Sequence, residues 1–245
     1  MQELGAYIQI YKNNGYPEFS LGSFRKYYPE SPLYIVSDNG YNFSELANTL
    51  KAKYEHSNIN VGVRDSGYIK EEMLEWLNRL KRCCEYCQSE YIIYLEDDIL
   101  IRSKIIINNN HMISGYQGNL IPKIILDYFS KEFSSINISS SRYGACGGTI
   151  YNRKMFLNNF IFFEQLIKKY FCYVKENLSN VFGFFDCAMT ILYMLAGHTY
   201  NINENLVGTI DFPDWKNMKK AIVHIQKKSA DDKIQSLIMK EFANE

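Results

Sequence analysis

Three consecutive carboxylates, Glu96, Asp97 and Asp98, directly follow the apolar segment YIIYL at residues 91–95. The length of this segment and its β-branched and aromatic content are typical of a buried strand in a parallel sheet. Alternation along an extended chain would point Glu96 and Asp98 to one side and Asp97 to the other. Clustered carboxylates beside a buried strand need a cation or hydrogen-bond donors to compensate them, and a hard divalent ion does so well. The triplet therefore predicts a metal site, although a solvated loop would show the same residues.

Two further acids stand at the ends of predicted elements. Asp38 follows the apolar segment at residues 33–36, and Asp186 precedes an uncharged helical segment at residues 187–197. A helix that is apolar all round is buried, so Asp186 would be a lone carboxylate at a buried helix N-terminus. Such an acid often caps the helix, and the helix dipole keeps it ionised. Asp186 is thus a candidate base, with helix capping as the alternative.

A glycine-rich turn and late basic residues complete the candidate set. Gly147 and Gly148 lie in YGACGGT, where the backbone must turn tightly or lie against a neighbour. His224 lies on an apolar strand predicted at residues 221–225 and is followed by Lys227. A histidine on an apolar strand is more often a core residue than a ligand, so its position alone does not assign it a role.

The order of the elements in the first half predicts an α/β fold. Strands and helices alternate there, which is the pattern of a right-handed, doubly wound parallel sheet. In such a sheet the carboxyl ends of the strands face the ligand crevice. We predict strands at residues 5–11, 33–36, 60–63 and 91–95, and helices at residues 19–28, 44–54 and 69–88.

The second half is predicted to be less regular. No GxGxxG follows the first strand and no GxxxxGK[ST] occurs, which argues against a dinucleotide-binding fold and a P-loop NTPase. We predict an irregular region at residues 102–141, strands at 149–153, 200–208 and 221–225, and helices at 156–177, 187–197 and 231–242.

Composition narrows the class of protein and its compartment. The 245 residues include 27 Lys+Arg and 27 Asp+Glu, so no general basic field favours nucleic acid as a partner. Most of the six cysteines lie in apolar or helical patterns, which is typical of reduced thiols, and the single CxxC does not favour zinc. We see no signal peptide, and the longest uncharged apolar stretch is too short to span a bilayer, so we expect a cytoplasmic protein.

Four segments carry a resemblance to a known family: LYIVSDNG, YIIYLEDD, YGACGGTIYNRKMF and GFFDCAMTILYMLAGHTYNI. Their order and spacing resemble those of nucleotide-sugar glycosyltransferases of the GT-A fold, over residues 6–224. LEDD is similar to the acidic triplet of inverting, family 2-like members, with Glu96 in place of the first Asp of DxD. The resemblance implies a single GT-A (Rossmann-like) domain over residues 1–245, with a mostly parallel central sheet flanked by helices and a small antiparallel part in the second half. It also implies a nucleotide-binding half (1–100), an acceptor-binding half (101–228) and a C-terminal helix (229–245).

The same resemblance implies roles for individual residues. Asp98 would hold Mn²⁺ or Mg²⁺ together with His224. Asp186 would be the catalytic base, although the family more often has Glu-Asp where this chain has Phe185-Asp186. The nucleotide sugar would be bound by Asp38, Arg64, Glu96, Asp97, Gly147, Gly148 and Lys227.

The predicted reaction is transfer of a hexosyl or N-acetylhexosaminyl group from a nucleotide sugar, with UDP as the expected nucleotide, to a hydroxyl of a glycan or protein. With Asp186 as base it would proceed by inverting single displacement. A retaining GT-A enzyme, a glycosidase that uses Asp98 and Asp186, and a non-catalytic nucleotide- or carbohydrate-binding module remain open. A nucleotidyltransferase is disfavoured, because GAYIQIYKNNG lacks a glycine-rich phosphate loop. Sugar, acceptor and oligomeric state stay open.

Overall fold

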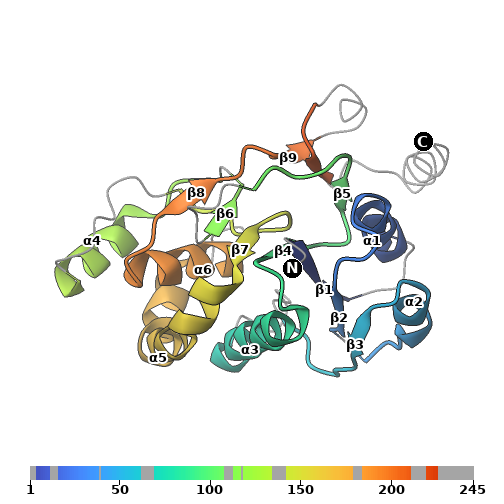
Figure 1. Cartoon of the computed structure of the whole chain (residues 1–245). Coiled ribbons are helices and arrows are strands. Elements are labelled where there is room, and N and C mark those ends of the chain that lie inside the picture. The colour runs from blue at the N-terminus through green and yellow to red at the C-terminus, as the bar shows by residue number, and fades with distance from the viewer. Residues whose placement is uncertain are drawn as a thin grey trace.

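The computed structural model describes residues 4–11, 16–38, 40–61, 69–107, 113–116, 118–133, 142–178, 184–210 and 219–225. A seven-stranded sheet runs through this part of the chain in the order β3-β2-β1-β4-β7-β6-β8 (Figure 1). Strands β3, β2, β1 and β4 are parallel, whereas β7 is antiparallel to both β4 and β6. The strands are β1 (Leu4–Ile10), β2 (Leu33–Ser37), β3 (Lys53–Glu55), β4 (Tyr91–Leu95), β6 (Ile113–Gly115), β7 (Ile150–Asn152) and β8 (Tyr200–Ile202).

Helices cover the two faces of this sheet (Figure 1). On one face, α3 packs beside α5, and α6 lies against α5 and β8. α1 and α2 lie on the opposite face. The helices are α1 (Tyr16–Tyr27), α2 (Ser44–Thr49), α3 (Lys70–Cys87), α4 (Lys123–Glu132), α5 (Arg153–Leu178) and α6 (Phe184–Leu195). None of the helices in the described ranges is long and apolar enough to cross a membrane.

A small second sheet joins distant parts of the chain. It has the order β5-β10-β9, from β5 (Ile99–Ile101), β10 (Ile222–Ile225) and β9 (Leu206–Ile210). β5 begins just after the acidic triplet and pairs antiparallel with β10. This pairing holds the end of β4 close to β10, the last described strand, and so brings the acidic triplet next to β10.

Local sequence explains the two central elements. All five residues of β4 are buried, as expected for a strand covered on both faces. Helix α3 buries Met73, Leu77 and Leu80 at helical spacing, and its first turn is capped by Glu72, whose Oε2 accepts the Ile69 N–H at 3.2 Å. The helix delivers the chain directly to β4.

The structure confirms the α/β fold with a mostly parallel sheet and an antiparallel part in the second half. It corrects several element bounds. The helix predicted at residues 44–54 ends at Thr49, because the chain turns at Lys51 (φ 50°) and returns as β3 beside β2. β3 thus replaces the strand predicted at 60–63, of which residues 60–61 are not extended in a sheet and 62–63 lie outside the described residues.

The second half is more regular than predicted. The region expected to be irregular, residues 102–141, contains β6 and α4. The strand expected at residues 200–208 is two strands, β8 and β9, because a turn closed by Leu206 N–H donating to Asn203 O (3.0 Å) separates them. The predicted C-terminal helix lies outside the described residues.

Candidate active site

A tight turn follows β4 and carries the acids. Ile99 N–H donates to Glu96 O at 3.1 Å, which places Asp97 and Asp98 in the turn between them. Ser20 Oγ of α1 also donates to Glu96 O, at 2.9 Å. Glu96 and Asp98 lie together as the alternation argument predicted, but the cause is this turn, since the strand ends at Leu95.

Strand β10 brings His224 to the same turn. His224 is paired with Ile99 across the small sheet, and Ile225 N–H donates to Asp98 O at 3.0 Å. His224 Nε2 lies 3.3 Å from Asp98 Oδ1 and 3.6 Å from Glu96 Oε2. Residues separated by more than 120 positions therefore meet because of the antiparallel pairing of β5 and β10.

These three side chains fit a divalent metal ion. One ligand atom from each of Glu96, Asp98 and His224 lies within 4.8 Å of the others. Two ligands about 2.1 Å from one octahedral ion lie about 3.0 Å apart when adjacent and about 4.2 Å apart when opposite, so the observed separations are compatible with shared coordination. Asp97 is not a member of this triad of described residues.

Asp186 interacts electrostatically with Glu96 and His224 of this triad. Asp186 is the third residue of α6 and partly buried. Burial, followed by the negative charge of Glu96, raises the pKa of Asp186 to about 7, while His224 acts in the opposite direction. Burial alone would lower the pKa of His224, but Asp98 and Glu96 raise it well above its ordinary value. In the absence of an ion, His224 therefore carries a proton that metal binding must displace.

The two glycines of the YGACGGT turn pack closely against neighbouring residues, and Gly147 contacts Glu96 of the triad. Gly147 N–H donates to Glu96 Oε1 at 3.1 Å, and a Cβ at Gly147 would lie 2.8 Å from Ile99 Cγ1 and 3.0 Å from Glu96. Gly148 has φ +86°, and a Cβ there would lie 2.8 Å from Leu206 Cδ1. Packing and backbone conformation thus require both glycines. Their contact with a sugar stays a prediction.

Cys146 lies next to the histidine of the triad, and its role was not predicted. Its Sγ is 4.0 Å from His224 Nδ1, the nitrogen that faces away from the two carboxylates. Burial raises the pKa of this thiol to about 11, so it stays protonated. The sequence offered only an apolar pattern around Cys146.

Asp38, the predicted nucleotide-binding acid, is engaged with a residue that the sequence analysis missed. Arg79 Nη1 donates to Asp38 Oδ1 at 2.5 Å, and the same oxygen accepts Val61 N–H at 2.9 Å. The Arg79 side chain is fully buried and that of Asp38 is 6% exposed. Arg79 lies three residues after Trp76 and four before Cys83, both buried, and this spacing is the signal that could have identified it.

Arg79 joins the carboxyl ends of three parallel strands. Its Nη1 also donates to Gln9 Oε1 of β1 at 3.2 Å, and its Nη2 donates to Ser57 Oγ at 3.0 Å and to Ile59 O at 2.8 Å, both after β3. In open α/β sheets, ligands bind near the carboxyl ends of the strands. Asp38 follows one such end and is bonded to Arg79, and its contact with a nucleotide stays a prediction. The other predicted contacts there, Arg64 and Lys227, lie outside the described residues.

Comparison with known proteins identifies the fold. No protein-family model and no curated protein sequence matches the chain. Among solved structures it is similar to the galactosyltransferase LgtC in complex with donor and acceptor sugar analogues, with 12% identity over 97% of this chain and 95% of that one and a TM-score of 0.58. It is also similar to apo mouse xyloside xylosyltransferase 1, with 10% identity over 94% and 99% of the chains and a TM-score of 0.53.

The chain therefore has a GT-A-like α/β fold, as the sequence resemblance implied. The more specific assignment to inverting, family 2-like enzymes finds no support in these comparisons. An acidic triplet predicts a metal site and carries no information about the stereochemistry of transfer.

Proposed function

We propose that this protein is a metal-dependent glycosyltransferase that uses a nucleotide-sugar donor. The observation that carries the proposal is the convergence of Glu96, Asp98 and His224 at the carboxyl end of β4 in a GT-A-like fold. That end of an open α/β sheet is where ligands bind. The diphosphate of a donor bound beside this triad would contact the cation that the triad would hold.

The triad would hold the ion through two carboxylate oxygens and one imidazole nitrogen. An imidazole ligand is less suited to Mg²⁺ than to a first-row transition metal, so we propose Mn²⁺ as the preferred ion. When bound, the ion would supply a Lewis acid that neutralises the departing diphosphate. Gly147 N–H donates to Glu96 Oε1 and so orients this carboxylate. A carboxylate held in a fixed orientation would favour binding of the ion.

Asp186 would contact the substrate on the same side of the sheet. This proposal is supported by the electrostatic interaction of Asp186 with Glu96 and His224 and by its burial, which raises its pKa to about 7 in the metal-free protein. Because the comparisons favour the retaining alternative, we propose that Asp186 holds a substrate hydroxyl and that the product keeps the anomeric configuration of the donor. UDP-hexose or UDP-N-acetylhexosamine is the proposed donor, and a hydroxyl of a glycan or protein the acceptor.

The proposal is tested by incubating the protein with a panel of UDP-sugars and mono- and disaccharide acceptors, with Mn²⁺, with Mg²⁺ and with EDTA, and measuring UDP release. We expect one donor to be consumed with Mn²⁺ and spared with EDTA. Asp98→Asn should abolish release, whereas Asp127→Asn, an exposed acid on α4, should leave it unchanged.

The anomeric proton of the transferred sugar, followed by NMR, then reports the stereochemistry. An α-linked donor that gives an α-linked product supports retention, and a β-linked product restores the inverting mechanism. Metal-dependent UDP binding without release of UDP from any donor would instead indicate a non-catalytic binding module.

A further inference from the structure

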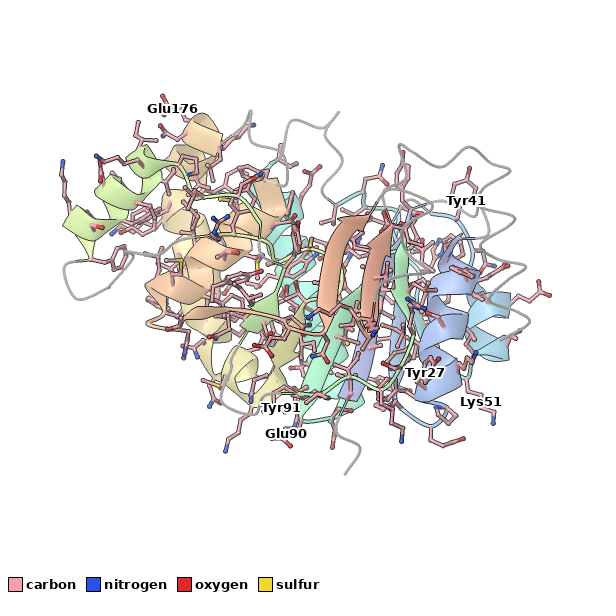
Figure 2. The ribbon with its side chains drawn as sticks, turned by 90° about the horizontal axis from the view of Figure 1, so that it is seen from above. Tyr27, Tyr41, Lys51, Glu90, Tyr91 and Glu176 are labelled. Carbon is pink, nitrogen blue, oxygen red and sulfur yellow. The ribbon has the colours of Figure 1, made fainter. Side chains whose placement is uncertain are left out.

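A cavity lies at the amino-terminal end of β4, whereas the acidic triad lies at its carboxyl end. Its volume is about 760 Å³, within the usual range for pockets that bind small molecules. Tyr91, the first residue of β4, and Ala221, which precedes β10, line it. Glu96 follows the last residue of β4, and five residues of extended chain separate it from Tyr91 by about 16 Å, whereas His224 is the third residue of β10. Figure 2 shows Tyr91 beside Glu90 at the lower edge of the molecule, where β4 begins.

Two buried or half-buried amides organise the polar side of this cavity. Asn203, only 3% exposed, donates from Nδ2 to Gly148 O at 3.2 Å and accepts Asn205 Nδ2 at 2.9 Å. Asn205 in turn binds the backbone of Ile106 in both directions, accepting its N–H at 3.0 Å and donating to its carbonyl at 2.7 Å. The wall formed by residues 103–107 is therefore fixed to the turn before β9. These bonds show a cavity with a defined shape.

The charge at the rim is predominantly positive. Among the described lining residues, three exposed lysines, Lys104, Lys219 and Lys220, face one acid, Glu204. The chain as a whole has no net charge, so this local excess is a feature of the cavity. It is opposite in sign to the Glu96–Asp98 turn. A ligand with a negative charge is favoured here by electrostatics.

The rest of the lining combines polar and apolar groups. Ser103 and Ser114 supply hydroxyls, and Ile107, Ile150 and Ile202 supply apolar surface. Hydroxyls can bond sugar hydroxyls, while isoleucines can contact the C–H face of a sugar ring. The lysines suit a carboxylate or a phosphate.

We propose that this cavity is a second binding site that takes an anionic saccharide, meaning a sugar that carries a carboxylate or a phosphate. The choice of a sugar, rather than another anion, rests on the proposed function. The site itself does not, because none of its lining residues belongs to the metal triad. Its position would let the protein hold a charged part of a glycan away from the reacting end.

The test follows the δ1-methyl NMR signals of the isoleucines while cellobiose, cellobiouronic acid or cellobiose 1-phosphate is added to the full chain without metal. Ile107, Ile150 and Ile202 report this cavity, and Ile99 reports the acidic turn. We expect the cavity methyls to shift with one or both anionic disaccharides, Ile99 to stay unchanged, and cellobiose to bind at least about tenfold more weakly.

Matched variants locate the binding. Lys219→Ser/Lys220→Ser should weaken anionic binding about three- to tenfold and reduce its salt dependence, since each exposed charge contributes modestly. Lys131→Ser/Lys154→Ser removes two exposed lysines from α4 and α5 and should change nothing. Asp98→Asn should also leave this binding intact.

Three results would overturn the inference: unshifted cavity methyls with all three sugars, equal affinity for neutral and anionic disaccharides, or equal loss of binding in both lysine pairs. Loss of binding in Asp98→Asn would place the sugar at the metal site instead. Absence of UDP-sugar turnover alongside intact anionic binding would refute the proposed function and leave this site standing.

Discussion

Replacing Arg79 by methionine should destabilise the protein strongly. The substitution keeps the length of the side chain but removes the guanidinium that joins Asp38, Gln9, Ser57 and the Ile59 carbonyl. Asp38 would be left with a carboxylate that is 6% exposed and has lost its cation. Breaking a buried ion pair by removing one partner costs about 3–5 kcal/mol. That is a large share of the 5–15 kcal/mol by which native domains are typically stable.

Urea denaturation followed by circular dichroism measures this cost, and Arg82→Met is the matched control. Arg82 lies on the same helix and binds Glu55 and Glu75, but its side chain is 38% exposed. Its removal should cost about 0–1 kcal/mol, as for other exposed ion pairs. The double variant Arg79→Met/Asp38→Asn should recover part of the loss, because no unpaired charge remains buried.

The cost should also depend on pH with a defined sign. Burial raises the pKa of Asp38 to about 6 from its ordinary value near 4, and Arg79 opposes that rise. An acid with a raised folded-state pKa favours the folded state at low pH, and this contribution is lost as pH rises through the folded-state pKa. Without Arg79 the pKa rises further, so the difference between Arg79→Met and wild type should be larger at pH 8 than at pH 5. Equal costs for the Arg79 and Arg82 variants, or a larger difference at pH 5, would refute this reasoning.

Three other substitutions test the site. Gly148→Ala should lower the free energy of unfolding by about 2 kcal/mol, because the φ of Gly148 is +86° and the new Cβ would meet Leu206. The control Gly22→Ala in α1 should be neutral or stabilising, because the space around Gly22 is open. Thermal unfolding of the two variants measures the difference. Gly147→Ala should weaken Mn²⁺ binding about ten- to a hundredfold, because the new Cβ would displace Glu96. Isothermal titration calorimetry measures this affinity, and an unchanged affinity would show that Gly147 does not orient Glu96 for metal binding. Burial and the charge of Glu96 raise the pKa of Asp186 to about 7 in the metal-free protein, and a bound cation lowers it. At saturating Mn²⁺, kcat/KM should therefore fall as pH drops through this lowered pKa, and Asp186→Asn should remove this limb of the profile; an Asp186→Asn variant with the wild-type profile would contradict the role.

The parts of the fold that could be predicted are those fixed by local pattern. The β-branched and aromatic run of β4 and the helical spacing in α3 each matched the observed element, since burial dictates both patterns. The prediction of a single helix over residues 44–54 was wrong, because a short helix followed by an edge strand has little periodicity of its own. There the pairing of β3 with β2, a tertiary contact, decides the structure.

The candidate site divides in the same way. Asp98 and Glu96 could be identified from their position after a buried strand. His224 was named as a metal ligand by family resemblance alone, and its place beside them depends on the pairing of β5 with β10, which links distant parts of the chain. Arg79 was missed because a charged residue on a helix is usually solvated, although its spacing from Trp76 and Cys83 puts it on the buried face of α3. Local sequence can thus indicate that the side chain is buried, but its partners Asp38, Gln9 and Ser57 come from tertiary structure.

Manganese binding observed by electron paramagnetic resonance, with and without UDP, tests the central claim most directly. The account predicts one Mn²⁺ site in the wild type whose affinity rises when UDP is added, because the diphosphate supplies further oxygen ligands. The site should be lost in Asp98→Asn and in His224→Ala, and retained in Asp127→Asn. If the wild type binds no Mn²⁺ in the presence of UDP, or if Asp98→Asn and His224→Ala bind it as well as the wild type does, the triad is not a metal site and the proposed reaction loses its basis.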